Sequence, residues 1–107
     1  MVMELARFKV DPESEQDFLA ARPAMVEAVT REVPGLESIA LVRLADGSWL
    51  DVVTWSSREA AERGAALAAA LHDARIWLDH IDEDLSMDLG EVLDSATGLG
   101  DGTANTA

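Results

Sequence analysis

The stretch LVRLADGSWLDVVTWSSREAAE, residues 41–62, decides the fold, because it encodes a strand, a tight turn, a second strand and the start of a helix without a break. Apolar, β-favouring residues fill both strands. The Asp46-Gly47 pair between them is a strong hairpin signal, since both residues tolerate positive φ. Residues 56–59, Ser-Ser-Arg-Glu, have the spacing of a capping box, in which a Ser hydroxyl and the Glu carboxylate bind free amides at a helix start. The stretch therefore predicts a hairpin followed directly by a helix.

A two-residue turn at Asp46-Gly47 fixes the expected pairing of the hairpin strands, residues 36–45 and 48–56. In this register Leu44 lies opposite Trp49, whereas a bulged or longer turn would shift every pair. One strand face then carries Trp49, Asp51 and Trp55, and the other carries Ile39, Leu41, Leu50 and Val52.

Both faces of this hairpin are largely apolar. A single layer of helices covers only one face of a sheet, so the other face needs a second partner. Another copy of the same chain is the simplest partner, because identical surfaces can bury each other around a twofold axis. We therefore predict a homodimer through the sheet face.

The segments before the hairpin predict a strand and a long helix. Residues 2–10 mix apolar and charged side chains as a first strand does, and Asp11-Pro12 is a typical helix opening. The helix is expected to run to about Glu32, with Pro23 either bending it or marking a new start at Arg22. The apolar stripe expected to be buried consists of Phe18, Ala21, Met25, Val29 and Val33.

After the hairpin, an alanine-rich helix, a break near His72-Asp73, a shorter helix and a strand at residues 84–93 are expected. This order predicts an α+β, ferredoxin-like fold, with a four-stranded antiparallel sheet and helices on one face. Residues 1–94 form the predicted domain, and residues 95–107, rich in Gly, Thr and Ala, a flexible acidic tail. The expected stripe of the helices is Ala60, Gly64, Leu67, Leu71, Ala74, Leu78 and Ile81.

The composition argues against several classes of partner. The 107 residues include 21 acidic and 8 basic side chains, giving a net charge of −13, which repels nucleic acid and anionic membranes. The chain has no cysteine, and its first ten residues lack the apolar run of a signal peptide. We expect a cytoplasmic protein that binds neither nucleic acid nor membrane.

Four features together resemble the antibiotic biosynthesis monooxygenase domain family. They are the segment DPESEQDFLAARPAMVEAV at residues 11–29, the VPG that follows at 33–35, the segment RLADGSWLDVVTWSSREAAE at 43–62, and the acidic final strand. The resemblance covers roughly residues 2–93 and implies a dimeric α+β barrel. It also implies a monooxygenase that uses no cofactor and acts on a small hydrophobic or aromatic metabolite.

Oxygenation without a cofactor needs aromatic walls and a group that takes a proton from the substrate. Trp49, Trp55 and Trp77 are the candidate substrate-binding residues, and core or dimer packing is their alternative role. Asp51 is a candidate catalytic residue, because a carboxylate on an apolar strand must be paired or protonated. His72, at the predicted helix break, is the second candidate catalytic residue.

Other interpretations of the polar residues remain open. Asp51 could instead form an ion pair with Arg7, Arg43 or an arginine of a partner chain, and His72 could stabilise a helix end. The cluster His80, Asp82, Glu83 and Asp84 does not have the spacing of a metal site, so no metal is predicted.

The chain departs from the family's pattern in its polar residues. It has no Tyr and only one Asn, Asn105, although the family's cofactor-free oxidases use polar aromatic and amide side chains. Haem degradation is disfavoured, because the first strand has no Asn and Gly64 with its alanine neighbours stands where a bulky Trp is expected. The alternative function is therefore a non-catalytic dimer that binds a small ligand or assists a biosynthetic pathway.

Overall fold

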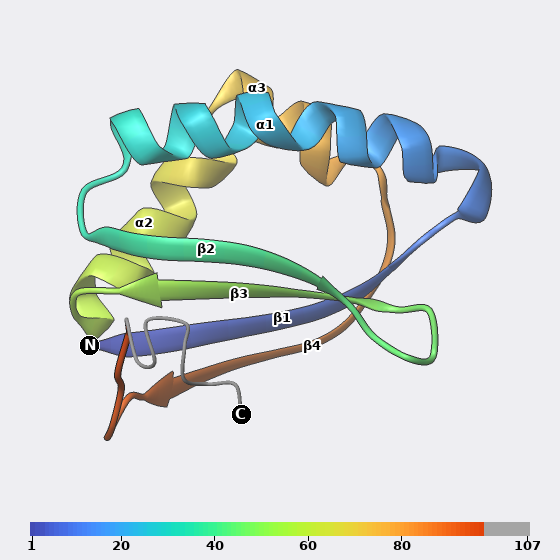
Figure 1. Cartoon of the computed structure of the whole chain (residues 1–107). Coiled ribbons are helices and arrows are strands. Elements are labelled where there is room, and N and C mark those ends of the chain that lie inside the picture. The colour runs from blue at the N-terminus through green and yellow to red at the C-terminus, as the bar shows by residue number, and fades with distance from the viewer. Residues whose placement is uncertain (98–107) are drawn as a thin grey trace.

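The computed structural model describes residues 1–97 of the chain, in which four strands and three α-helices form one α+β unit. All the helices lie on one side of the sheet, and its other side carries none (Figure 1). In chain order the elements are β1 Val2–Val10, a 3-10 turn Pro12–Ser14, α1 Glu15–Glu32, β2 Leu36–Arg43, β3 Trp49–Trp55, α2 Arg58–Ala69, α3 His72–Leu78 and β4 Ile81–Glu91.

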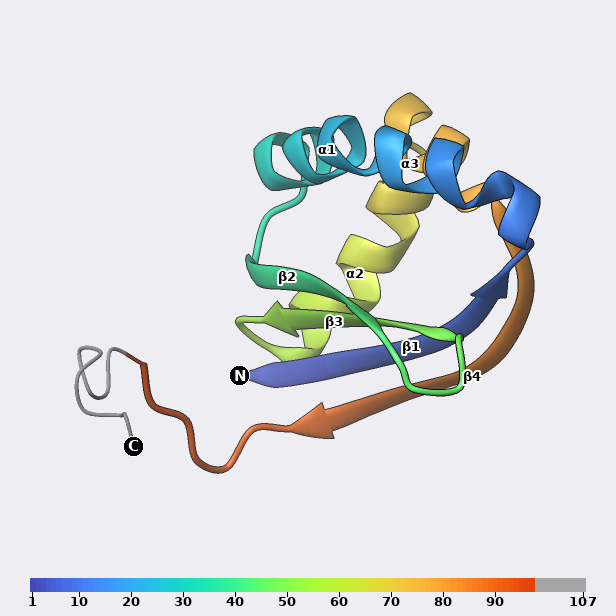
Figure 2. The same ribbon diagram turned by 45° about the vertical axis from the view of Figure 1, so that its right-hand side comes forward.

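The sheet is antiparallel throughout, with the strand order β2-β3-β1-β4. The turned view shows α1 and α3 side by side above the sheet, with α2 rising obliquely between them and the strands (Figure 2). The predicted α+β arrangement is confirmed. Of the expected tail, residues 95–97 are exposed and irregular, and its flexibility stays a prediction because residues 98–107 lie outside the described part.

The hairpin turn differs from the predicted two-residue loop. A four-residue turn runs from Leu44 to Gly47, whose N–H donates to the Leu44 carbonyl at 3.0 Å, while the Leu44 N–H donates to Ser48 at 2.8 Å. Gly47 has a φ of +89°, which favours glycine, and inserts one extra residue as a bulge. Arg43 rather than Leu44 therefore lies opposite Trp49, and the predicted register was wrong by one residue.

The side chain of Asp46 stabilises this turn. Its Oδ1 accepts hydrogen bonds from the Ser48 hydroxyl at 2.6 Å and the Ser48 N–H at 2.9 Å, and Arg7 also pairs with the carboxylate. These bonds, chiefly that of the Ser48 hydroxyl, lower the pKa of Asp46 to about 2. The carboxylate therefore stays charged, and the turn stays bonded, across the neutral pH range.

The shifted register decides which side chains meet the helices. Trp49, Asp51, Val53 and Trp55 all face the helix layer and are buried. Ile39 and Leu41, expected on the opposite face, lie opposite Val53 and Asp51 and so share the helix side. The face without helices carries Met3, Leu5, Ala40, Val42, Leu50, Val52 and Thr54.

The helix ends also differ in detail from the sequence prediction. Ser57, not Ser56, caps α2, since its hydroxyl accepts from the Ala60 N–H at 3.0 Å. The Ser56 N–H is already bonded to the Gly35 carbonyl at 2.8 Å, so the helix begins one residue later than expected. α1 continues through Pro23 without interruption, so the new start at Arg22 was a wrong alternative.

The core between sheet and helices is an aromatic cluster. Phe18 of α1 is fully buried and stacks on Trp77 of α3 with ring centroids 5.1 Å apart, and Phe8 and Trp49 pack on it from the sheet. The predicted stripe of α1 is confirmed, with Ala21 only partly buried. In α2 and α3 the predicted stripe was partly wrong, because Ala61 and Trp77 are buried while Leu67 and Leu78 are exposed.

Gly64 of α2 makes room for a strand side chain. A Cβ at this position would lie 2.3 Å from the Trp55 ring, so the helix passes over the indole at a distance that only glycine allows. Trp55 is itself 4% exposed and therefore has little freedom to move away. The absence of a bulky residue at position 64 is thus the space that Trp55 fills.

We predict that Gly64→Ala destabilises the fold by about 1–3 kcal/mol through overpacking against Trp55. This effect should outweigh the roughly 1 kcal/mol that alanine adds to helix stability. Urea unfolding measures the difference, with Gly90→Ala as the matched control, since a Cβ there meets nothing within 4 Å. An equally stable or more stable Gly64→Ala protein would contradict the close contact.

Candidate functional site

A cavity of about 230 Å³ lies between the helix face of the sheet and the helices. The side chains that line it come from all three helices and all four strands, and most of them are apolar. Two carboxylates, Glu4 on β1 and Asp51 on β3, are the exceptions. The principal apolar walls are Met25, Val29, Ile39, Val53, Trp55, Ala68 and Trp77. The arrangement fits a hydrophobic molecule that presents a polar group to a carboxylate.

Glu4 points into this cavity because it alternates with the core residues of β1 on the helix face. The Trp55 indole N–H donates to its Oε1 at 3.0 Å. Burial raises the pKa of Glu4 above its ordinary value of 4.5, the Trp55 hydrogen bond opposes this rise, and the neighbouring charge of Asp51 adds to it. Glu4 is thus a carboxylate whose proton affinity is increased by an apolar environment.

Asp51 is held by an arginine from the helix layer. Its Oδ1 lies 2.8 Å from Nη2 of Arg22, and both side chains are nearly buried, 12% and 11% exposed. The Arg22 guanidinium also lies over the Trp77 ring, 4.8 Å from its centroid. Its Nη1 atom is buried without a hydrogen-bond partner among residues 1–97. The ion pair fixes one edge of Asp51 and leaves the second oxygen without a partner.

The three tryptophans do not have the same position. Trp55 and Trp77 line the cavity, as the sequence interpretation proposed, while Trp49 lies outside it. Trp49 packs against Phe18 at 5.2 Å between ring centroids, and the Arg43 guanidinium lies 4.2 Å above its ring. The structure therefore brings Asp51, Trp55 and Trp77 together and gives Trp49 a packing role.

The two histidines lie away from the cavity lining. His72 is exposed at the first position of α3 rather than at the end of α2, and His80 follows the end of α3. Within residues 1–97 no group of three or more His, Cys, Asp or Glu side chains is placed to hold a metal ion. None of the helices in the described part is long and apolar enough to cross a membrane.

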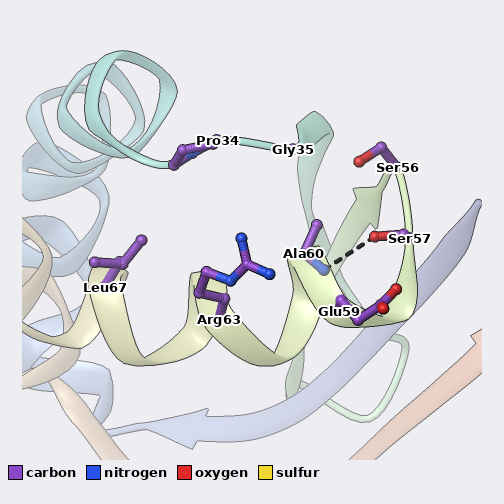
Figure 3. Close-up of a pocket in the computed structure, with 8 residues that line it drawn as sticks. All are labelled: Pro34, Gly35, Ser56, Ser57, Glu59, Ala60, Arg63 and Leu67. Atoms are coloured by element: carbon purple, nitrogen blue, oxygen red, sulfur yellow. Dashed lines mark hydrogen bonds between the residues drawn. The ribbon is translucent and has the colours of Figure 1, made fainter.

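A second hollow, of about 390 Å³, lies beside the start of α2 (Figure 3). It is bounded by the Pro34-Gly35 loop on one side and by Ser57, Glu59 and Arg63 of the α2 segment on the other. The Ala60 amide at this helix start is already bonded to the Ser57 hydroxyl. The hollow contains no predicted site residue, and Glu59 and Arg63 bring it one charge of each sign.

Sequence reasoning missed two residues of the site, Glu4 and Arg22. Glu4 could have been found from the alternation of residues 2–10, which places it on the same face as Phe8 and Val10. Arg22 was missed as the partner of Asp51, for which Arg7 and Arg43 were expected. Those two arginines pair instead with Asp46 and Glu15. No sequence signal joins Arg22 to Asp51, because the contact depends on how α1 crosses the sheet.

The fold and the cavity define a small α+β domain built to enclose a ligand between its sheet and its helices. The family model for "Antibiotic biosynthesis monooxygenase" matches residues 1–70. The chain belongs to this family. No curated protein matches it closely enough to add a relative.

Solved structures show the same fold at low sequence identity. SnoaB, described as a cofactor-independent oxygenase from Streptomyces nogalater, is 19% identical, with a TM-score of 0.70 over 90% of this chain and 96% of that one. Protein Rv0793 of Mycobacterium tuberculosis is 21% identical, with a TM-score of 0.66 over 90% and 98%. An antibiotic biosynthesis monooxygenase is 19% identical, with a TM-score of 0.66 over 88% and 100%. At these identities the likeness establishes the fold alone.

We predict that Glu4→Gln raises the melting temperature at pH 7 by a few degrees. The raised pKa means that the folded state favours protonated Glu4. Its contribution to stability is full below about pH 4.5, the ordinary value, and is lost as the pH rises through the folded pKa. A glutamine oxygen can still accept the Trp55 hydrogen bond, so the variant mainly removes the buried charge.

Thermal unfolding from pH 4 to pH 8 measures this effect. The gap between Glu4→Gln and the wild type should widen with pH, whereas the exposed control Glu37→Gln should follow the wild type throughout. A gap that is constant with pH would show that Glu4 is not desolvated.

Proposed function

We propose that the protein is a cofactor-independent monooxygenase that oxidises a small hydrophobic or aromatic metabolite in the cavity between sheet and helices. The observation that carries the proposal is the pairing of apolar aromatic walls, Trp55 and Trp77, with an arginine-held carboxylate, Asp51. Membership in the antibiotic biosynthesis monooxygenase family supports the reaction type. The description of SnoaB as a cofactor-independent oxygenase supports the absence of a bound redox group.

Oxygenation without a cofactor requires the substrate itself to reduce O2. An electron-rich aromatic ring does so after it loses a proton, and the net change converts a CH2 group and O2 into a carbonyl group and water. Asp51 is the proposed proton acceptor, because the Arg22 ion pair orients it while its second oxygen remains open to a ligand. The surrounding apolar side chains exclude water and strengthen the electrostatic effect of both charges.

We propose further that the protein acts as a homodimer through the helix-free face of the sheet. That face carries aliphatic side chains, among them Leu5 and Val52, that remain only partly buried in a single chain. Val42, on the same face, is 39% exposed. A second sheet packed against it would remove these groups from water and add the missing second layer.

Oxygen consumption with anthrone and hydroquinone-like aromatics tests the proposed activity. Asp51→Asn keeps the size of the side chain but removes the proton acceptor, and should lower kcat/KM by about 100-fold or more. Glu37→Gln, exposed on β2 and absent from the cavity lining, is the matched carboxylate control and should retain wild-type turnover.

His72→Ala tests the second catalytic candidate from the sequence. Its exposed position favours retained turnover, and a loss would assign it a role that Asp51 alone does not fill. Oxygen consumption by folded Asp51→Asn protein at the wild-type rate would contradict the assignment of Asp51.

Sedimentation at micromolar concentration tests the dimer. Val52→Asp should shift the protein to the monomer, because the substitution would bury an unpaired charge between the two sheets. Leu19→Glu is the matched control, since Leu19 is 44% exposed on α1 and lies outside the sheet. A Val52→Asp protein that still sediments as a dimer would show that another surface joins the subunits. Val53, which the sequence register left as a dimer candidate, faces the helices and is unsuitable for this test.

The second candidate function is ligand binding without catalysis. The observation that favours it is the scarcity of polar groups in the cavity, where Glu4 and Asp51 are the only charged lining residues. Thermal stabilisation by an aromatic compound together with no oxygen consumption across the panel would favour this function.

A further inference from the structure

Glu4 lies at the junction of two chambers. Beyond the inner cavity, an outer chamber of about 200 Å³ opens beside α2 and β4, with Ala61, Glu62 and Leu89 among its lining residues. Glu4, Ala65 and Met87 line both chambers. Met87 is 62% exposed, so the outer chamber leads from the surface towards Glu4. A molecule that occupies both chambers must pass the Glu4 carboxylate.

The chamber sizes favour an elongated ligand. Ordinary ligand pockets have volumes of roughly 300 Å³ or more. Neither the inner cavity, at about 230 Å³, nor the outer chamber, at about 200 Å³, reaches that size alone. Together they exceed it, so a ligand with two or more fused rings has space only if it lies across the Glu4, Ala65 and Met87 boundary.

The charges at this boundary select the polar group of the ligand. One Glu4 oxygen accepts the Trp55 N–H, and the other has no hydrogen-bond partner among residues 1–97. Asp51, close enough to affect Glu4 electrostatically, has its own charge balanced by Arg22. The ionised wall therefore has one negative charge in excess. A hydrogen-bond donor on the ligand complements that charge, whereas a ligand carboxylate is repelled by it.

The bond to Trp55 does not by itself require an acid. A glutamine would accept the indole N–H equally well without the cost of desolvating a charge. A carboxylate at this position is therefore explained by a ligand group that binds the free oxygen.

We propose that this site takes an elongated, fused-ring aromatic ligand with a hydroxyl group that donates to Glu4, and that it discriminates against ring carboxylates. The inference rests on the proposed function only in placing the substrate in the same cavity, and it names the class of that substrate. Glu4 then acts as a specificity-determining residue, separate from the proton acceptor Asp51.

Isothermal titration at pH 7 with three naphthalene probes of equal ring size tests the proposal. These are 2-naphthol, 2-methoxynaphthalene, which lacks the donor, and 2-naphthoate, which carries the excluded charge. The wild type should bind 2-naphthol at least about tenfold more tightly than either of the others. Equal affinities, or no binding of any probe, would overturn the proposal.

Substitutions then locate the discrimination. In Glu4→Gln the preference for 2-naphthol over 2-naphthoate should fall by roughly tenfold or more, while Glu37→Gln should keep it. Ala65→Leu, at the shared wall, should weaken 2-naphthol binding without reversing the preference. Unchanged selectivity in folded Glu4→Gln protein would overturn the role of Glu4, and unchanged 2-naphthol affinity in Ala65→Leu would overturn the position of the ligand.

Binding and oxygen consumption are separate readouts. Selective binding of 2-naphthol without oxygen consumption by any aromatic would reject the monooxygenase and leave the ligand class standing. Turnover of aromatics with no discrimination among the three probes would retain the monooxygenase and reject the role of Glu4.

Discussion

One glycine in the left-handed region of backbone space sets the rest of the structure. Gly47, at φ +89°, adds one residue to the hairpin loop and so shifts β3 by one position against β2. Because successive side chains of a strand point to opposite faces, this shift places Ile39 and Leu41 on the same side as Asp51 and Val53. The helix face thereby gains an aliphatic wall beside its carboxylate, which a two-residue turn would have placed on the other side.

The cavity depends on contacts between elements that lie far apart in the chain. Trp55 occupies the space that Gly64 leaves open in α2, and its indole N–H reaches Glu4 on β1. On the far wall, Arg22 of α1 holds Asp51 of β3 at 2.8 Å and covers Trp77 of α3. Each carboxylate is thus oriented by a side chain from another element. Such positioning is what a proton acceptor or a selective hydrogen bond requires.

The two faces of the sheet have different chemistry and are suited to different tasks. The helix side combines aromatic rings with Glu4, Asp51 and Arg22, and it encloses a cavity. The helix-free side carries aliphatic residues at the centre of the sheet, with Leu5 and Val52 as examples, and a flat surface of that kind suits packing against another sheet. This division is why the proposed activity and the proposed dimer can be tested by separate substitutions.

The sequence by itself determined the order of the elements, the α+β class and the buried stripe of α1, because these follow from local periodicity, caps and turn residues. It also identified Asp51, Trp55 and Trp77, since a carboxylate and large aromatics stand out on a short apolar chain. Only the tertiary structure decided that Gly47 forms a bulge, that Ser57 rather than Ser56 caps α2, and that His72 lies outside the cavity. The pairing of Arg22 with Asp51 and of Glu4 with Trp55 also required the fold, because 29 and 51 residues separate the partners and no local preference records their contact.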